Sequence, residues 1–317
     1  FIASGWRPVV WMGVFMLSTA FIVWSGIEKG IERYTKIFMP VFIVLLAALA
    51  INSLTLPGAR EGIGFLLRPD FSKITGATIL KAMGQSFFSM SLGLGCMITY
   101  GSYVKPEVNL NKAINQIEIF DTGVAFLAGA MIIPAVYVFS GTEGMGAGPS
   151  LMFISLPKVF SAMGKAGTFV GILFFVTAIF ATLSSCISVL ESITANCMEI
   201  FHTSRKKTVL VLSVIYLAAS AVIALGYSIF YVEVKLPNGS VGQLLDIMDY
   251  ISNSVMMPFI ALLSTILIGW VVTPDYVISE MERSGDKFRR KKLYRVMIRY
   301  VVPVMMFVLF LQSTGIL

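Results

Sequence analysis

A run of glycines and serines, GQSFFSMSLGLGCMITYGSY at residues 84–103, interrupts a long apolar segment of the sequence. Ser89, Ser91, Gly93 and Gly95 fall near its middle. Each Gly costs a helix about 1 kcal/mol relative to Ala, and Ser hydroxyls compete for backbone hydrogen bonds, so the helix is predicted to unwind here. At membrane depth, unwound backbone must line a cavity or be buried in protein, where its carbonyls face cations and its amides face anions. The alternative is that these small residues only pack helices closely together.

A second polar run, ATLSSCISVLES at residues 181–192, places Ser184 and Ser185 side by side, with Ser188 one helical turn further on. A hard cation prefers oxygen ligands, and two hydroxyls with a nearby backbone carbonyl supply three of them. Serine pairs are also common in membrane helices that bind nothing. The run therefore indicates either a cation site or ordinary helix packing.

Two carboxylates fall inside apolar segments: Asp121, in the string IEIFDTGVAFLAG, and Glu191. An acid within a membrane span is costly, and by default it marks a path for ions or protons. Asp246 and Asp249 lie near the start of a further apolar segment, where carboxylates are more often solvated than functional. The sequence contains no GxSxG, no HExxH and no phosphate-binding loop, so we predict that the protein is not an enzyme.

The composition indicates that membrane helices position these groups. Of the 317 residues, 57% are hydrophobic and only 13% are charged, whereas typical soluble domains carry about 25% charged residues. Apolar stretches long enough to cross a hydrocarbon core of about 30 Å recur along the chain, without the alternation of barrel strands. We therefore predict an all-α, polytopic membrane helical bundle with eight spans. The predicted spans are residues 8–26, 37–54, 78–101, 117–139, 168–199, 207–230, 247–273 and 296–316.

The distribution of Lys and Arg predicts the orientation of the bundle. The loops after the first, third, fifth and seventh spans hold sixteen of these residues, and the loops on the opposite side hold eight. Because cytoplasmic loops carry the excess of positive charge, both ends of the chain are predicted to face outward from the cell membrane. The net charge of +7 then reflects topology, so the lipid bilayer is an expected partner and nucleic acid is not. An outward start also suggests that an odd number of spans is missing upstream.

We predict one transmembrane domain over residues 1–317, with two notable connections. Residues 140–167 mix Gly and Pro with apolar side chains, which is expected of an extracellular lid packed on the bundle. Residues 274–295 are predicted to form a basic cytoplasmic loop.

Several strings of the sequence resemble the neurotransmitter:sodium symporters in their prokaryotic form. They are GQSFFSMSLGLG, FDTGVAFLAG, GPSLMFISLP and ATLSSCISVLE, together with Gly30 followed nine residues later by Pro40. The resemblance covers essentially the whole chain and implies an inverted-repeat transporter fold with a broken helix. The eight spans would be the family's fourth to eleventh, so its first three spans would be absent from this chain.

The resemblance also implies roles for particular residues, including two sodium sites that are each only partly present in this chain. The substrate would be an amino acid or related small molecule. The residues expected to bind it are Phe88, Ser89, Ser91, Leu94, Ser185 and Val189. The residues expected to hold sodium are Ser89, Asp121, Ala181, Ser184 and Ser185. Tyr103 and Glu199 resemble inner-gate residues, and Asp249 resembles the acid of an outer gate.

The expected function is therefore sodium-coupled uptake by alternating access. A proton-coupled transporter of the same fold and a non-transporting regulator or scaffold are the alternatives, and a channel is disfavoured because the polar groups cluster in two runs. Asp121 stands where many members have an Asn, and Ala125 replaces the Ser that binds chloride in animal members. We expect the Asp121 carboxylate to supply the charge of chloride, making transport independent of that ion.

Overall fold

The computed structural model describes residues 5–68, 70–141, 152–153, 156–237, 239, 241–285 and 287–316. In this part of the chain, seven helical segments are long and apolar enough to cross a membrane. They are α1 (Trp6–Trp24), η1 with α2 (Ile27–Glu32, Arg33–Leu54), α6 (Leu110–Ser140), α8 (Lys165–Phe201), α9 (Arg205–Leu225), α10 to η6 (Leu244–Val272) and α13 to α14 (Lys291–Ser313). The predicted helical membrane bundle is thus confirmed for the described residues, which also include a short antiparallel pair of strands, β1 (Val234–Lys235) and β2 (Val241–Gly242). The chain divides into two compact units.

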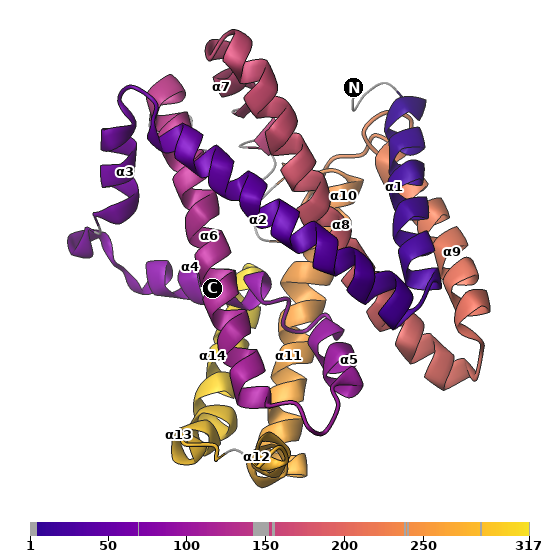
Figure 1. Ribbon diagram of the computed structural model, residues 1–317. Helices are drawn as coiled ribbons and strands as arrows, with labels where there is room; N and C mark the ends of the chain where they lie inside the picture. The colour runs from indigo at the N-terminus through magenta and orange to yellow at the C-terminus, as the bar shows by residue number, and fades with distance from the viewer. Residues whose placement is uncertain are drawn as a thin grey trace. The chain divides into compact units, whose positions relative to one another are not determined.

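The first unit contains Phe1–Gly26, Gly76–Asn115 and Ile187–Leu317. In it, α1 lies alongside α9 (Figure 1). The buried face of α1 includes Thr19, Ile22 and Val23, whereas Trp11 and Phe21 on its other face are 66% and 62% exposed. Exposed apolar side chains on this scale are expected of a helix whose outer face meets lipid.

The same unit contains a second helix pair. The segment α10 (Leu244–Asp249), η5 (Tyr250–Met256), α11 (Met257–Ile266) and η6 (Leu267–Val272) packs along α13 (Lys291–Val296), η7 (Met297–Val301) and α14 (Val302–Ser313). Two reciprocal hydrogen bonds, each 3.1 Å long, join the pair: the Trp270 indole donates to the Arg299 carbonyl, and the Arg299 Nε donates to the Gly269 carbonyl. A Cβ at Gly269 would lie 2.8 Å from the Ile298 carbonyl oxygen, so the small residue permits this close approach.

The second unit contains Ile27–Thr75 and Gln116–Cys186. Besides α2 and parts of α6 and α8, it holds the short helices α3 (Ala59–Leu67), η2 (Phe71–Lys73) and α7 (Leu156–Ala162). Its core joins four helices, because Leu49 of α2, Val136 of α6, Val159 of α7 and Phe174 of α8 are buried in one cluster.

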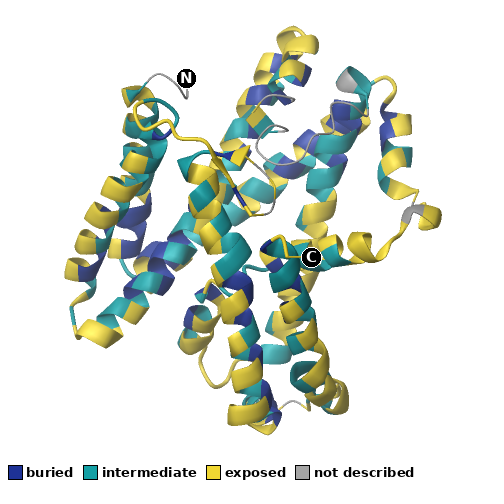
Figure 2. Ribbon diagram, turned by 180° about the vertical axis from the view of Figure 1, so that it is seen from behind, coloured by how far each residue is buried: buried dark blue, intermediate teal, exposed yellow. Residues whose placement is uncertain are grey.

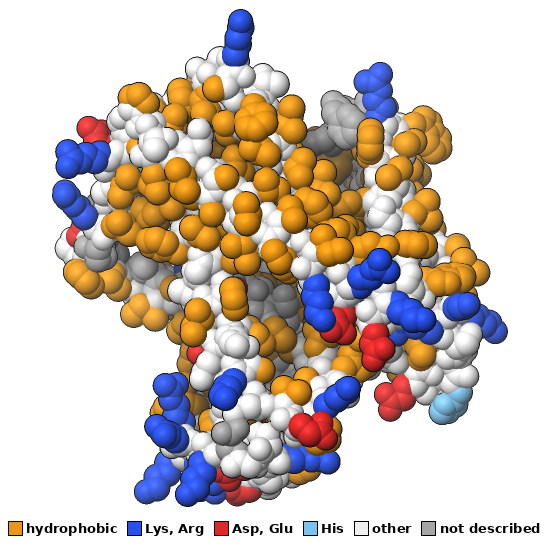
Figure 3. All heavy atoms as spheres, in the orientation of Figure 1, with side chains coloured by type: hydrophobic (Ala, Val, Ile, Leu, Met, Phe, Trp, Pro, Cys, Tyr) orange, Lys and Arg blue, Asp and Glu red, His pale blue; other side chains and the backbone are white. Residues whose placement is uncertain are grey.

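Exposed apolar side chains cover much of the surface. Figure 2 shows exposed residues along most of the long helices, and Figure 3 shows hydrophobic side chains spread over the visible face, with Lys and Arg gathered mainly near helix ends. Each of the seven long segments has at most 28% of its most apolar window buried. A lipid environment accounts for this distribution, because exposing this much apolar surface to water would be unfavourable.

Two predicted segments differ from the structure, and a third lies partly outside the described residues. The second span begins at Ile27, so Lys29, Arg33 and Lys36 lie on helix where a loop was predicted; long basic side chains at a helix end can extend toward the interface, which permits this. The basic loop at residues 274–295 contains helix α12 (Pro274–Glu282) and the start of α13. The predicted lid, residues 140–167, lies partly outside the described residues, and α7 belongs to the part that is described.

Candidate functional site

The third predicted span is a broken helix. Helix α4 (Gly76–Ser89) ends before the glycine-rich run, and α5 (Cys96–Tyr103) starts after it. Between them the backbone turns three times into the left-handed region, with φ of 52° at Ser91, 91° at Gly93 and 77° at Gly95. The unwinding predicted from the Gly and Ser content is therefore confirmed. The break presents backbone carbonyls and amides of residues 90–95 that no longer belong to a regular helix.

Close contacts explain why glycine stands at Gly93. A Cβ at this position would lie 2.7 Å from the carbonyl oxygen of Met257, the first residue of α11, and 3.4 Å from Cζ of Phe87. Phe87 itself is buried with Met257, Ala261 and Leu309. Phe87 thus anchors the end of α4 against α11 and α14. The break begins directly after this anchored turn.

We predict that Gly93→Ala lowers the stability of the protein by about 2 kcal/mol or more, because an L side chain at positive φ adds roughly 1–2 kcal/mol and the new Cβ meets the Met257 carbonyl. Thermal unfolding in detergent measures this. The matched control is Gly101→Ala on α5, where a Cβ meets nothing within 4 Å and Ala favours the helix. Equal melting temperatures for the two variants would contradict the role given to Gly93.

The residues expected to bind substrate lie around this break and on α8. Phe88, Ser89 and Leu94 are exposed, and Ser91 is half-buried. Val189 is half-buried in the first unit, whereas Ser185 belongs to the second unit. The predicted substrate residues of the break thus lie together in the first unit, whereas Ser185 lies in the second unit.

A cavity of about 400 Å³ opens beside the end of α4 in the first unit. Its polar lining includes Lys81 and Gln85 of α4, Ser254 of η5 and Gln312 of α14, and Phe88 forms part of its apolar wall. The Ser254 carbonyl is fixed by a 2.5 Å hydrogen bond from the Ser313 hydroxyl, so this wall is held in place. One predicted substrate residue, Phe88, therefore borders an open cavity of the size of a small organic molecule.

Three oxygen atoms cluster on α8 at the predicted sodium residues. The Ser184 and Ser185 hydroxyls both donate to the carbonyl oxygen of Ala181, at 2.8 and 3.3 Å. A hydroxyl that donates its proton to a carbonyl can still use its oxygen as an acceptor. Two hydroxyl oxygens and a carbonyl oxygen within one helical turn form a partial ligand set for a hard cation.

The remaining predicted sodium ligands lie in different units. Asp121, on α6, is half-buried in the second unit, and Ser89 belongs to the first. Among the described residues, no group of three or more His, Cys, Asp or Glu side chains could hold a metal ion. An alkali cation does not need such a group, because carbonyl and hydroxyl oxygens suit it.

A buried carboxylate joins three helices of the first unit. Glu191 of α8 is fully buried. It accepts a 2.6 Å hydrogen bond from the Tyr103 hydroxyl of α5 and pairs with the guanidinium of Arg205 at the start of α9. Arg205 also donates from Nε to the Val23 carbonyl at the end of α1, at 2.9 Å. The Glu191–Arg205 pair therefore ties the end of the broken helix to α1, α8 and α9.

Two further hydrogen bonds run along the same contact between α5 and α8. The Tyr100 hydroxyl donates to the Ser188 hydroxyl over 2.8 Å, and the Thr99 and Ser192 hydroxyls lie 3.1 Å apart. The absence of a side chain at Gly95 permits this contact, because a Cβ there would lie 3.3 Å from the Ser192 hydroxyl. Polar groups thus line the contact from the break down to Glu191.

The predicted gate residues are found in three places. Tyr103 joins the Glu191 cluster, whereas Glu199 is exposed two turns further along α8, so their shared gate role stays a prediction. Asp249, the last residue of α10, is exposed and accepts a 2.6 Å hydrogen bond from the Asn253 amide.

Sequence reasoning did not assign Glu191 and Arg205 to one site. Glu191 was recognised as an acid inside a span, and Arg205 only as one of the charges that set topology. The available signal was that a buried carboxylate needs a partner, and the partner stands fourteen residues further along the chain.

Comparison with known proteins gives consistent results. The sequence model described as "Sodium:neurotransmitter symporter family" matches residues 7–316. The relatives include an uncharacterized sodium-dependent transporter, YhdH, of Bacillus subtilis, 34% identical over 96% of this chain and 66% of its own length. An uncharacterized sodium-dependent transporter of Haemophilus influenzae is 36% identical over 98% of this chain and 66% of its own length. The chain thus spans slightly less than two thirds of these relatives.

Among solved structures, the chain is similar to the crystal structure of MhsT in complex with L-phenylalanine. The TM-score is 0.83 and the sequence identity is 37%, over 99% of this chain and 69% of the other. The similarity therefore extends over nearly all of the present chain, including both polar runs.

Proposed function

Because the chain belongs to the sodium:neurotransmitter symporter family, we propose that the protein containing it imports an amino acid together with sodium by alternating access. The observation that carries this proposal is the cluster of the Ser184 and Ser185 hydroxyls around the Ala181 carbonyl, which supplies oxygen ligands to a cation. Sodium moving down its gradient then provides the free energy to accumulate the substrate.

The broken helix supports an amino-acid substrate. Backbone amides at a helix break suit a carboxylate, and backbone carbonyls there suit an ammonium group. Around them, Phe88, Leu94 and Val189 are apolar, while Ser89 and Ser91 offer hydroxyls. The structure similar to this chain was determined with L-phenylalanine. We therefore propose a neutral amino acid with an apolar side chain as the substrate.

Sodium would occupy two sites, each completed by groups outside this chain. We propose that Ala181, Ser184 and Ser185 contribute to one site, and that Ser89 and Asp121 contribute to the other. The protein would lie in the cell membrane as a multi-pass bundle, with the ends of this chain facing outward.

The Glu191 cluster is proposed to close the inner side. Tyr103 ends the second half of the broken helix, so its hydrogen bond to Glu191 couples the substrate-binding break to α8 and α9. Release of substrate inward would require this contact to open. Glu191 is also the observation behind proton coupling as a second candidate, but its ion pair with Arg205 favours a structural role in holding the helices together.

The Asp121 carboxylate should make transport independent of chloride. We expect equal uptake in sodium chloride and sodium gluconate for the unmodified protein, because Asp121 supplies a fixed negative charge near sodium. Asp121→Asn should weaken sodium-dependent uptake at least about tenfold, the effect of losing roughly 1.4 kcal/mol. Adding Ala125→Ser to Asp121→Asn should restore uptake in chloride but not in gluconate. A chloride requirement in the unmodified protein would contradict the proposal.

Binding of labelled amino acids to the purified full-length protein tests the function. A panel of neutral, acidic and basic amino acids should show binding of apolar neutral ones in sodium and little binding in choline. Binding that does not depend on sodium would favour the proton-coupled candidate, and no binding in either salt would favour a regulator or scaffold.

A further inference from the structure

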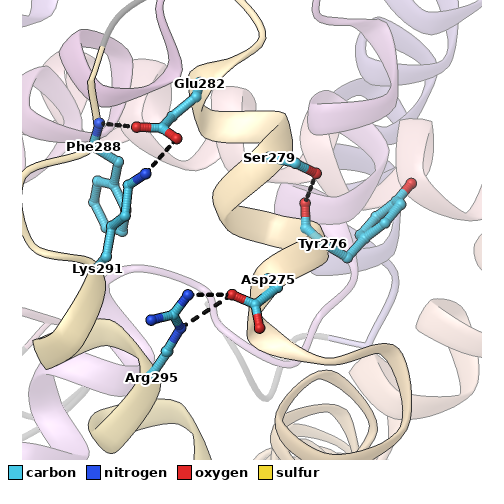
Figure 4. A network of polar contacts seen from close by, with 7 residues as sticks. All are labelled: Asp275, Tyr276, Ser279, Glu282, Phe288, Lys291 and Arg295. Atoms are coloured by element: carbon cyan, nitrogen blue, oxygen red, sulfur yellow. Dashed lines mark hydrogen bonds and ion pairs between the residues drawn. The ribbon is translucent and has the colours of Figure 1, made fainter.

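The connection between α12 and α13 is a closed helical hairpin. The Glu282 carboxylate, at the end of α12, accepts hydrogen bonds from the Phe288 backbone N–H at 2.9 Å and from the Lys291 ammonium at 2.5 Å (Figure 4). Asp275, at the start of α12, accepts from Arg295 of α13 at 2.5 and 3.1 Å (Figure 4). The bond from Lys291, reinforced by the Phe288 N–H, holds the pKa of Glu282 below its usual range. The hairpin is therefore fixed at both ends at neutral pH.

Four further cations lie on this hairpin without being used to close it. They are Lys287, Arg289, Arg290 and Lys292, and all four are exposed. Within the described part of the chain, none of the four forms an ion pair, whereas Lys291 and Arg295 do. Among the described residues, no ion pair therefore offsets the charge of these four cations.

Part of this charge surrounds a recess. A hollow of about 480 Å³ is lined by Glu282, Gly285, Lys287, Phe288, Arg289 and Lys291. Its carboxylate is hydrogen-bonded to Lys291, and Lys287 and Arg289 add two more cations to the lining for an incoming anion. In Figure 3, Lys and Arg side chains gather in the region that holds α13 in Figure 1. Arg and Lys bind phosphate oxygens through short charge-assisted hydrogen bonds.

Apolar surface begins directly beside the cations. Leu293 and Val296 of α13 are 58% and 52% exposed, and Tyr300 of η7 is 56% exposed. The same helical segment, Lys291–Ser313, is long and apolar enough to cross a membrane, so Lys292 stands in its first turn and the other three cations lie just before it. A ligand with a phosphate at one end and hydrocarbon at the other matches this surface, in which charged side chains are followed by apolar ones.

We propose that the α12–α13 hairpin binds an anionic phospholipid, with the phosphate headgroup at Lys287, Arg289, Arg290 and Lys292 and the acyl chains along Leu293 and Val296. The headgroup site is distinct from the residues proposed to bind amino acid and sodium. Its occupancy would fix the end of α13, and through the reciprocal Trp270–Arg299 contact it would also steady the end of η6.

Native mass spectrometry of the full-length protein with added phosphatidylglycerol or phosphatidylcholine tests the proposal. The unmodified protein should retain phosphatidylglycerol at least about tenfold more tightly than phosphatidylcholine, since each basic residue near an anionic surface contributes measurably. The variant Lys287→Gln, Arg289→Gln, Arg290→Gln, Lys292→Gln should lose this preference. A matched control, Lys29→Gln, Arg33→Gln, Lys206→Gln, Lys207→Gln, removes the same number of exposed charges elsewhere and should keep it.

Two further arms make the result decisive. Sodium-dependent amino-acid binding should be unchanged in the four-charge hairpin variant, which shows that it is folded. Inorganic phosphate at millimolar concentration should not displace the lipid, because it has no acyl chains. Equal lipid retention by the hairpin variant and the control variant would overturn the proposal. Displacement by inorganic phosphate would also overturn it, and would indicate a site for a free anion.

Discussion

The variant Ser184→Ala, Ser185→Ala should lose sodium-dependent amino-acid binding. The two hydroxyls and the Ala181 carbonyl are the clustered oxygens on α8, and the variant removes two of the three. Hydrogen-bond-type contacts to a charged group contribute about 1.5–3 kcal/mol each, so the affinity for sodium should fall about 100-fold or more. Titration of labelled amino-acid binding with sodium measures the change.

The control for this experiment lies on the same helix. Thr182 donates its hydroxyl to the carbonyl four residues earlier, Ala178, over 2.8 Å, as Ser185 does to Ala181, but Thr182 is outside the proposed site. Thr182→Val should therefore leave the sodium titration unchanged. If the double serine variant bound amino acid with the unmodified sodium dependence, α8 would not hold the sodium site.

Arg205→Ala should destabilise the protein more than any other single change considered above. It leaves the fully buried Glu191 carboxylate without its cation, which typically costs about 3–5 kcal/mol and lowers the melting temperature by about 10 °C. The variant Glu191→Gln, Arg205→Met should recover most of this loss, because it leaves no unpaired charge. Thermal unfolding followed by tryptophan fluorescence in detergent measures both.

An exposed ion pair provides the comparison for Arg205. Arg295 pairs with Asp275, but their side chains are 44% and 61% exposed, so Arg295→Ala should cost no more than about 1 kcal/mol. Similar melting temperatures for Arg205→Ala and Arg295→Ala would show that burial of Glu191 does not matter for stability. A double variant no more stable than Arg205→Ala alone would contradict the account of an uncompensated charge.

The helix break could be predicted from sequence because its cause is local. Two glycines and two serines within seven residues lower helix propensity wherever they stand, and the left-handed conformations at Gly93 and Gly95 follow from the same residues. The α8 oxygen cluster was predictable for a similar reason, since Ser184 and Ser185 reach the Ala181 carbonyl within one turn of their own helix.

The Glu191–Arg205 contact could not be predicted in this way because it depends on how helices pack. Hydrophobic content identifies spans but does not say which faces meet, and Arg205 alone is indistinguishable from a charge that sets topology. The hairpin at residues 274–295 was missed for another reason. High charge suggested a loop, yet Glu, Lys and Arg are good helix formers outside the membrane.

Uptake of a labelled apolar amino acid into proteoliposomes that contain the full-length protein tests the central claim most directly. With an inward sodium gradient, we expect transient accumulation above the external concentration, and no accumulation when sodium is equal on both sides or replaced by choline. Accumulation that persists without a sodium gradient, or that follows a proton gradient alone, would contradict sodium-coupled transport.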